Sequence, residues 1–100
     1  MDAALTTRVA RRVAILAELR VLLIEKLGVR RQADEIDPDT PLFGSGLGLD
    51  SVDAVELMVH LEDVFRVRLP NNIGGRAEMR TVNTLVDLIV AREAQVRAVT

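Results

Sequence analysis

Hydrophobic residues recur at three- and four-residue spacing along several stretches of the chain, which is the pattern of an amphipathic helix. Thr7 is a suitable N-cap for the first stretch, and Gly28 is suited to close its C-terminal end. We therefore expect a helix over residues 7–27, preceded by a frayed end over residues 1–6. Its apolar positions are Val9, Val13, Leu16, Leu19, Leu23 and Leu27.

Two further helices are expected in the second half of the chain. Asp50 is a good N-cap for a helix over residues 51–65, where Asp53 adds favourable negative charge to the first turn, and Pro70 is expected to stop it. Thr81 can cap the last helix. The glycine pair Gly74–Gly75 leaves room for only a short helix near residues 73–79. The core stripe of the last helix comprises Val82, Leu85, Val86, Ile89 and Val90.

Residues 29–50 form a long loop that contains several prolines and glycines, and loops of this length in compact domains usually carry function. Its expected anchors on the core are Ile36, Leu42, Phe43, Leu47 and Leu49. No stretch shows a convincing strand pattern. The sequence thus predicts an all-α fold over residues 1–100, a small four-helix bundle with three main helices, one short helix and a long loop between the first two.

Composition excludes several classes of function. Cysteine is absent and His60 is the single histidine, so disulfides, thiol nucleophiles and His-rich metal centres are excluded. Phe43 and Phe65 are the only aromatic residues, which argues against a protein that stacks nucleic-acid bases. With neither a membrane-length apolar run nor a signal-peptide core, we expect a soluble, cytoplasmic monomer that binds no membrane.

Charge is strongly segregated along the chain, although the net charge is only −2. Residues 1–31 carry seven basic and three acidic side chains, and residues 64–100 carry six and three. Residues 32–63 hold nine acids and no lysine or arginine. This acidic block should attract basic partner surfaces and repel nucleic acid.

A helical wheel gives residues 51–65 two apolar faces. The expected core face comprises Ala54, Leu57, Met58, Leu61, Val64 and Phe65. Val52, Val55 and Val59 lie on the opposite side, flanked by Glu56, Glu62 and Asp63. Two interpretations remain open at this point. The helix is either buried on both sides, or it presents an apolar docking surface with an acidic rim.

Ser51 stands at the start of this helix, directly after the glycine-rich stretch "GSGLGLD". His60 is on the same helix but too far away to act as its base, and the glycine spacing fits neither a nucleophile elbow nor a dinucleotide fingerprint. A helix N-terminus accommodates a phosphate. Ser51 is therefore better suited to receive a phosphodiester than to catalyse, with the glycines giving a modifying enzyme access to the backbone.

The segment "GLGLDSVDAVELMVHLEDVF" resembles the prosthetic-group site of acyl carrier proteins, and the similarity extends over about residues 14–91. The resemblance implies that Ser51, next to Asp50, carries 4′-phosphopantetheine, whose thiol holds acyl groups as thioesters. It implies a phosphopantetheinyl transferase and acyl-transfer, condensing or acyl-activating enzymes as partners. Their docking surface would comprise Val52, Asp53, Val55, Glu56, Val59, Glu62 and Asp63.

The resemblance further implies that the protein is a discrete carrier with no catalysis of its own. Its acyl chain would slip between helices at Leu57, Leu61, Leu69, Met79 and Ile89. Arg66, Arg68 and "NNIGGRAEM" depart from housekeeping fatty-acid carriers, so a specialised polyketide, lipid or hybrid pathway is as well supported as fatty-acid synthesis. The alternatives are a carrier of aminoacyl or peptidyl groups and an unmodified helical interaction module.

Overall fold

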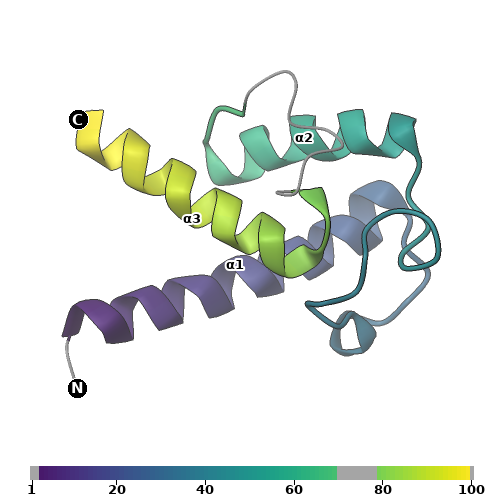
Figure 1. Cartoon of the computed structure of the whole chain (residues 1–100), viewed down its shortest axis with the longest axis horizontal. Coiled ribbons are helices and arrows are strands. Elements are labelled where there is room, and N and C mark those ends of the chain that lie inside the picture. Colours follow the sequence, from purple (N-terminus) through teal and green to yellow (C-terminus); the bar gives the residue numbers. More distant parts are fainter. Residues whose placement is uncertain (1–2, 70–78, 100) are drawn as a thin grey trace.

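Three α-helices make up the fold in the computed structural model, which describes residues 3–69 and 79–99. They are α1 (Ala3–Leu27), α2 (Ser51–Phe65) and α3 (Val82–Val99), and the loop between α1 and α2 contains one 3-10 turn, η1 (Ala33–Glu35) (Figure 1). The described ranges contain isolated β-bridges but no strand. The all-helical class is confirmed. The additional short helix expected near residues 73–79 lies, except for Met79, outside the described residues.

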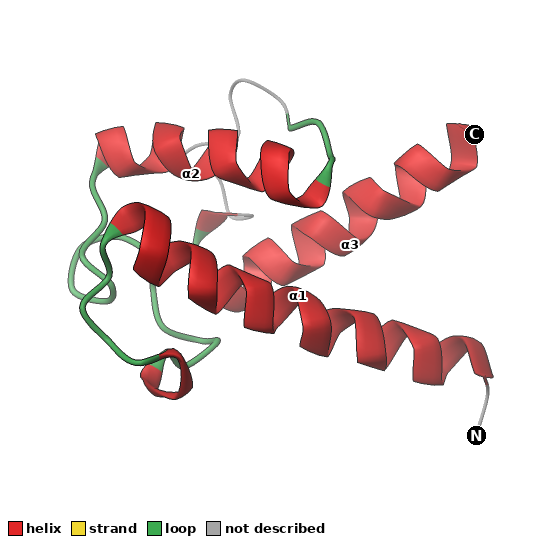
Figure 2. Ribbon diagram, turned by 180° about the vertical axis from the view of Figure 1, so that it is seen from behind, coloured by secondary structure: helices red, strands yellow, loops and turns green. Residues whose placement is uncertain are grey.

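The helix α1 runs the length of the molecule and packs against both other helices (Figures 1 and 2). In both views α2 lies beside the C-terminal half of α1 and runs antiparallel to it. The start of α3 crosses the middle of α1, and the N- and C-terminal ends of the chain diverge on one side. The end of α1 and the start of α2 therefore lie at the same end of the molecule.

One hydrophobic core lies where the three helices meet. Its fully buried side chains come from all three helices and from the long loop: Ile15, Leu19, Leu23, Ile36, Leu42, Leu57, Leu61, Val82, Leu85 and Ile89. Each such residue contributes about 1.5–3 kcal/mol through burial of its apolar surface. The core stripe predicted for α3 is confirmed, with Val86 also buried and Val90 partly buried against the cluster.

The N-terminal half of α1 differs from the sequence prediction. The helix begins at Ala3 rather than at Thr7, so Thr7 is not its N-cap and residues 3–6 belong to the helix. Alanine and leucine are strong helix formers, and no glycine or proline interrupts the segment. Val9 and Val13 are exposed rather than buried, because this half of the helix extends beyond the core. Gly28 ends α1 as expected, with a left-handed φ of 71°.

The end of α2 is set by the backbone conformation of Arg66. This residue has a left-handed φ of 56°, and the helix ends directly before it at Phe65. Pro70, expected to stop the helix, lies outside the described residues and further along the chain. The turn at Arg66 brings Val67 and Leu69 back into the core, where the Leu69 N–H donates a 2.8 Å hydrogen bond to the carboxylate of Glu62.

The long loop is anchored to α1 on one side and to the residues that precede α3 on the other. The expected anchors are confirmed, since Ile36, Leu42 and Leu49 are buried and Phe43 and Leu47 pack partly against the core. The Arg20 guanidinium on α1 donates two hydrogen bonds, of 3.1 and 2.9 Å, to the Ile36 carbonyl oxygen. On the other side, the Leu42 N–H donates to the Arg80 carbonyl oxygen at 2.9 Å. These contacts hold the loop against α1 and the start of α3.

Ion pairs join the outer parts of α1 and α3. Arg11 donates two hydrogen bonds to the Glu93 carboxylate, and Arg12 pairs with Asp87. The hydrogen bond to Glu93, with that residue's negative charge, raises the pKa of the Arg11 guanidinium against the opposing effect of partial burial. Because the arginine of each pair is more than a third exposed, solvent screens the pairs, and they orient the two helices more than they stabilise them.

Candidate functional site

The turn that precedes α2 is shaped by its glycines. Gly44 and Gly48 have left-handed φ values of 67° and 76°. A Cβ atom on Gly46 would lie 1.9 Å from the Pro41 carbonyl oxygen, so only glycine fits there without a shift of the backbone. The Leu47 N–H donates to this same oxygen at 2.9 Å. The tight turn itself therefore accounts for the glycines, a reason that the sequence pattern alone did not reveal.

A reciprocal capping box opens α2, as the sequence predicted in part. The Asp50 carboxylate accepts a 2.9 Å hydrogen bond from the Asp53 N–H, and the Asp53 carboxylate accepts a 3.0 Å hydrogen bond from the Asp50 N–H. Asp50 is thus the N-cap, which leaves Ser51 as the first residue of the helix. Because Asp50 provides the cap, the exposed hydroxyl of Ser51 is available for chemistry.

The position of Ser51 is suited to an anionic substituent. The first N–H groups of a helix have no carbonyl partner within it, and the helix dipole places partial positive charge there. A phosphate group on Ser51 would lie beside these groups. His60 follows nine residues later, about 13 Å along the helix axis, so it cannot take the proton of Ser51. The arrangement favours a serine that is modified over a serine that catalyses.

The outer face of α2 carries three exposed valines, which we call the valine stripe: Val52, Val55 and Val59, with exposed fractions of 64%, 63% and 58%. The opposite face is buried through Ala54, Leu57, Leu61 and Phe65, and Met58 is partly buried. The alternative that α2 is buried on both sides is therefore wrong. The helical wheel placed Val64 on the core face, which is wrong in part: the residue lies at the margin of that face and is 43% exposed.

Comparison with known proteins identifies the family. The family model described as "Phosphopantetheine attachment site" matches residues 17–89, which include the glycine turn and all of α2. Acyl carrier proteins of Chlorobium phaeobacteroides, Chlorobium phaeovibrioides and Chlorobium luteolum are each 35% identical over 71 residues, or 71% of this chain and 85% of the relative. The chain belongs to the acyl carrier protein family. Its cofactor is phosphopantetheine, and its role is that of a carrier.

The four acidic side chains expected around the valine stripe of this acyl carrier differ in how exposed they are. Glu56 and Asp63 are exposed. Asp53 is partly buried in the capping box, and Glu62 is partly buried and accepts the Leu69 N–H. Two of the four acids therefore also have a structural role. None of the described residues form a cluster of three or more metal-ligating side chains.

A mixed-charge hollow of about 450 Å³ adjoins the C-terminal end of the valine stripe. Its lining residues are Val59, Glu62, Asp63, Arg66, Val67 and Arg68. The exposed Arg66 and Arg68 thus border the acidic end of α2. The sequence showed these two arginines as a departure from the family pattern, but their place beside the expected docking surface follows from the left-handed turn at Arg66.

The residues expected to line a cargo pocket in the acyl carrier lie together in the core. Leu57, Leu61, Leu69, Met79 and Ile89 belong to one cluster, and none is more than 7% exposed. The structure brings these five side chains together as closely packed core residues. In the described parts of the chain, no helix is both long and apolar enough to span a membrane.

Proposed function

We propose that this chain carries acyl groups as thioesters on 4′-phosphopantetheine attached to Ser51. The observation that supports this most directly is the exposed Ser51 at the first position of α2, behind a glycine turn closed by the Asp50–Asp53 capping box. The residues fit the group, because the start of the helix offers backbone N–H groups to its phosphate. The bound group supplies the thiol that this cysteine-free chain lacks.

Loading requires a phosphopantetheinyl transferase. The Ser51 oxygen forms a bond to the phosphorus next to the pantetheine of coenzyme A while the P–O bond within the pyrophosphate breaks. The nucleotide half leaves with the other phosphate, and a base takes the hydroxyl proton. Asp50, fixed by its hydrogen bonds to Asp53, keeps Ser51 at the head of the helix during this step. His60 lies about 13 Å further along α2 and cannot take this proton, and in this proposal the transferase supplies the base.

Partner enzymes dock on the outer face of α2 in this proposal. The exposed Val52, Val55 and Val59 provide an apolar centre. Glu56 and Asp63 provide negative charge at its margin, to which Asp53 and Glu62 add from their partly buried positions. An apolar centre with a charged margin is typical of a transient interface. Acyl-transfer, condensing or acyl-activating enzymes with basic surfaces would therefore bind here, steered by charge.

The pathway that the carrier serves is fatty-acid, polyketide or related lipid synthesis in this proposal. The similarity to acyl carrier proteins of three Chlorobium species supports acyl cargo over aminoacyl cargo. For the cargo chain, the core residues Leu57, Leu61, Leu69, Met79 and Ile89 remain a predicted pocket. Because they are closely packed, a chain would enter there only if the helices moved apart.

The decisive experiment is loading followed by intact-mass measurement. The protein is incubated with coenzyme A, Mg²⁺ and a broad-specificity phosphopantetheinyl transferase. The mass should rise by one phosphopantetheine in the native chain and in Ser45→Ala, and should not rise in Ser51→Ala. Ser45 is the matched control because it is also exposed and lies in the glycine turn. A gain that persists in Ser51→Ala, or no gain in the native chain, would contradict the proposal.

A further inference from the structure

The docking surface proposed on α2 changes its charge along its length. Glu56 and Asp63 are exposed beside the valine stripe. Beyond the end of the helix, Arg66 and Arg68 are exposed as well, and both line the hollow of about 450 Å³ together with Glu62 and Asp63. The two acids and two arginines of this hollow cancel in formal charge. The surface is thus acidic along the middle of α2 and mixed at its C-terminal end.

The two arginines of the hollow are left without an opposite charge inside the chain. Arg66 and Arg68 form no ion pair with any residue that the structure describes, although Asp63 lines the same hollow. The Glu62 carboxylate instead accepts the Leu69 N–H at 2.8 Å. Because neither guanidinium is compensated internally, both are available to an acidic group on another protein.

Arg66 occupies a backbone position that favours glycine. Its φ is 56°, and the residue that follows a helix in this left-handed conformation is usually glycine, because a Cβ atom is disfavoured there. Every other positive-φ residue in the described part of the chain is a glycine. Side chains held in disfavoured backbone conformations are found most often at functional sites. The conformation of Arg66 therefore supports a role for its exposed side chain at this surface.

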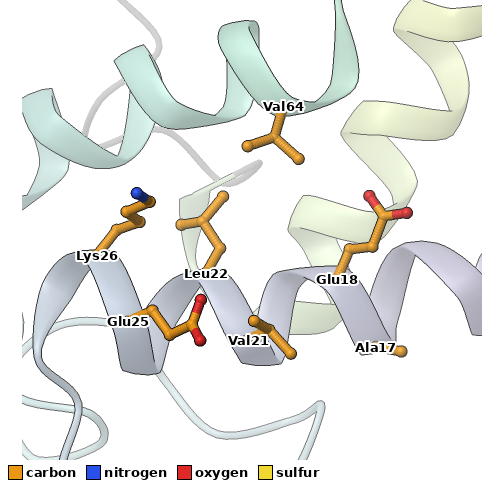
Figure 3. A pocket seen from close by; sticks show the side chains of 7 residues that line it. All are labelled: Ala17, Glu18, Val21, Leu22, Glu25, Lys26 and Val64. Atoms are coloured by element: carbon orange, nitrogen blue, oxygen red, sulfur yellow. The ribbon is translucent and has the colours of Figure 1, made fainter.

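A second opening adjoins the C-terminal part of α2, on the side that faces α1. It is a groove of about 370 Å³ lined by Val21 and Leu22 of α1 and Val64 of α2, and the last two extend toward each other across it (Figure 3). Val64 follows Val59 by five residues, or about 140° around the helix. A protein seated on the valine stripe therefore covers the mixed-charge hollow, which Val59 itself lines, rather than this groove.

A partner bound at Ser51 is large enough to reach both ends of the surface. Arg66 lies about 22 Å beyond Ser51 along the helix axis, whereas a standard interface of about 800 Å² per protein spans about 30 Å. Glu56 lies about 15 Å before Arg66, which exceeds the screening length of about 8 Å at physiological ionic strength. The two ends of the surface therefore select charge on the partner independently of each other.

We propose that Arg66 and Arg68 select partner enzymes whose docking surface is basic opposite the middle of α2 and acidic opposite its C-terminal end. The inference rests on the proposed acyl-carrier function and adds which partners the carrier accepts. Acidic side chains of the partner contact the two arginines in the hollow, while its basic side chains face Glu56 and Asp63. An enzyme with a uniformly basic surface is disfavoured, because it brings like charge against the arginines.

Two synthetic helical peptides serve as probes of this charge order. Both have about 18 residues, or about 27 Å of helix, with one leucine face and the same numbers of lysines and glutamates. The end-acidic peptide has its glutamates in the last turn, and the mid-acidic peptide has them in the middle. Each is titrated into the unloaded chain, and Kd is obtained from NMR shifts of the valine-stripe methyl groups. The native chain should bind the end-acidic peptide about five-fold more tightly.

Two variants test the arginines separately. Arg68→Glu should weaken binding of the end-acidic peptide by about three- to ten-fold and should not weaken binding of the mid-acidic peptide. Arg66→Gly removes the other charge without backbone strain, since glycine suits the left-handed turn, and should weaken the end-acidic peptide by about two- to five-fold. The matched control is Arg8→Glu, an equal change in net charge to Arg68→Glu at an exposed residue of α1 outside the hollow, which should affect both peptides equally.

Several outcomes would overturn this inference while leaving the carrier function intact. One is equal binding of the two peptides by the native chain, and another is a preference that survives in both Arg68→Glu and Arg66→Gly. Binding of neither peptide would show that the hollow does not dock a protein of this charge order. Elution of the native chain as a dimer would assign the surface to a second copy. Failure of Ser51 to gain phosphopantetheine, seen by mass, would instead contradict the proposed function.

Discussion

Asp50 and Asp53 each accept the other's backbone N–H, at distances of 2.9 and 3.0 Å between nitrogen and oxygen. Ser51 lies between these two residues, so its backbone is held on both sides while its own side chain remains exposed. A capping box normally stabilises a helix terminus. In this chain it also fixes the direction in which the proposed attachment site faces.

Removing the cap should therefore affect both folding and loading. Asp50→Ala is expected to lower the free energy of unfolding by about 0.5–2 kcal/mol. It should also slow phosphopantetheine transfer to Ser51, because the first turn of α2 will fray. Asp34→Ala is the control, since Asp34 is exposed in η1, away from α2. Thermal melts and loading rates measured on both variants check this, and equal behaviour of the two would count against the role of Asp50.

Substitutions on the two faces of α2 should have different effects, one on stability and the other on docking. Leu61→Ala empties a fully buried site and should cost about 2–5 kcal/mol of stability. Val59→Asp changes an exposed residue, so the free energy of unfolding should change by no more than about 0.5 kcal/mol. It should nevertheless weaken transfer to partner enzymes, because a charge replaces part of the apolar centre. Denaturant melts and transfer rates distinguish the two, and unfolding by Val59→Asp would show that the valine stripe is not a docking surface.

Charge reversal at the exposed acids should weaken docking in a salt-dependent manner. Glu56→Lys and Asp63→Lys both place a like charge against a basic partner, and the resulting loss of association rate should shrink as ionic strength rises. Asp34→Lys makes the same change in net charge away from α2 and should have a smaller effect. Association rates with the transferase at low and high salt provide the measurement. A loss of equal size for all three variants would indicate a net-charge effect without a specific surface.

The anchor between α1 and the long loop can be tested at Arg20. Its guanidinium donates two hydrogen bonds to the Ile36 carbonyl oxygen, and Arg20→Ala removes both. Hydrogen bonds from charged groups are worth about 1.5–3 kcal/mol, so a loss toward the lower end is expected for this partly exposed side chain. Arg31→Ala is the control, because Arg31 makes a single long contact of 3.4 Å to the Gly46 carbonyl oxygen. Amide hydrogen exchange in the loop should accelerate in Arg20→Ala alone.

Gly46 should tolerate substitution less well than its neighbour Gly44. A methyl group on Gly46 meets the Pro41 carbonyl oxygen at 1.9 Å, whereas a methyl group on Gly44 meets no atom within 4 Å. Gly44→Ala should cost about 1–2 kcal/mol, because its left-handed backbone disfavours a side chain. Gly46→Ala should cost more, since backbone must move, and it should also slow loading at Ser51. Equal melting temperatures for the two variants would contradict the close contact at Gly46.

Local signals in the sequence determined α2 almost completely. An aspartate cap, an acidic third position and the helical period predicted its start at Ser51 and its buried side, whereas the exposure of the valine stripe stayed open until the fold was known. These features depend on contacts within a few residues, which a sequence pattern contains. The same reasoning predicted Thr81 as the cap directly before α3, and its hydroxyl accepts the Thr84 N–H at 3.2 Å.

Tertiary structure decided what depends on residues far apart in the chain. Val9 and Val13 fit the helical period of α1 but are exposed, because α3 packs against a different face of that half of the helix, the face that carries Arg11 and Arg12. The need for glycine at position 46 arises from the returning backbone at Pro41, and the groove at Val21 exists because α2 places Val64 opposite α1. Periodicity shows which residues share a face of one helix. Which part of that face is covered depends on where the other helices pack.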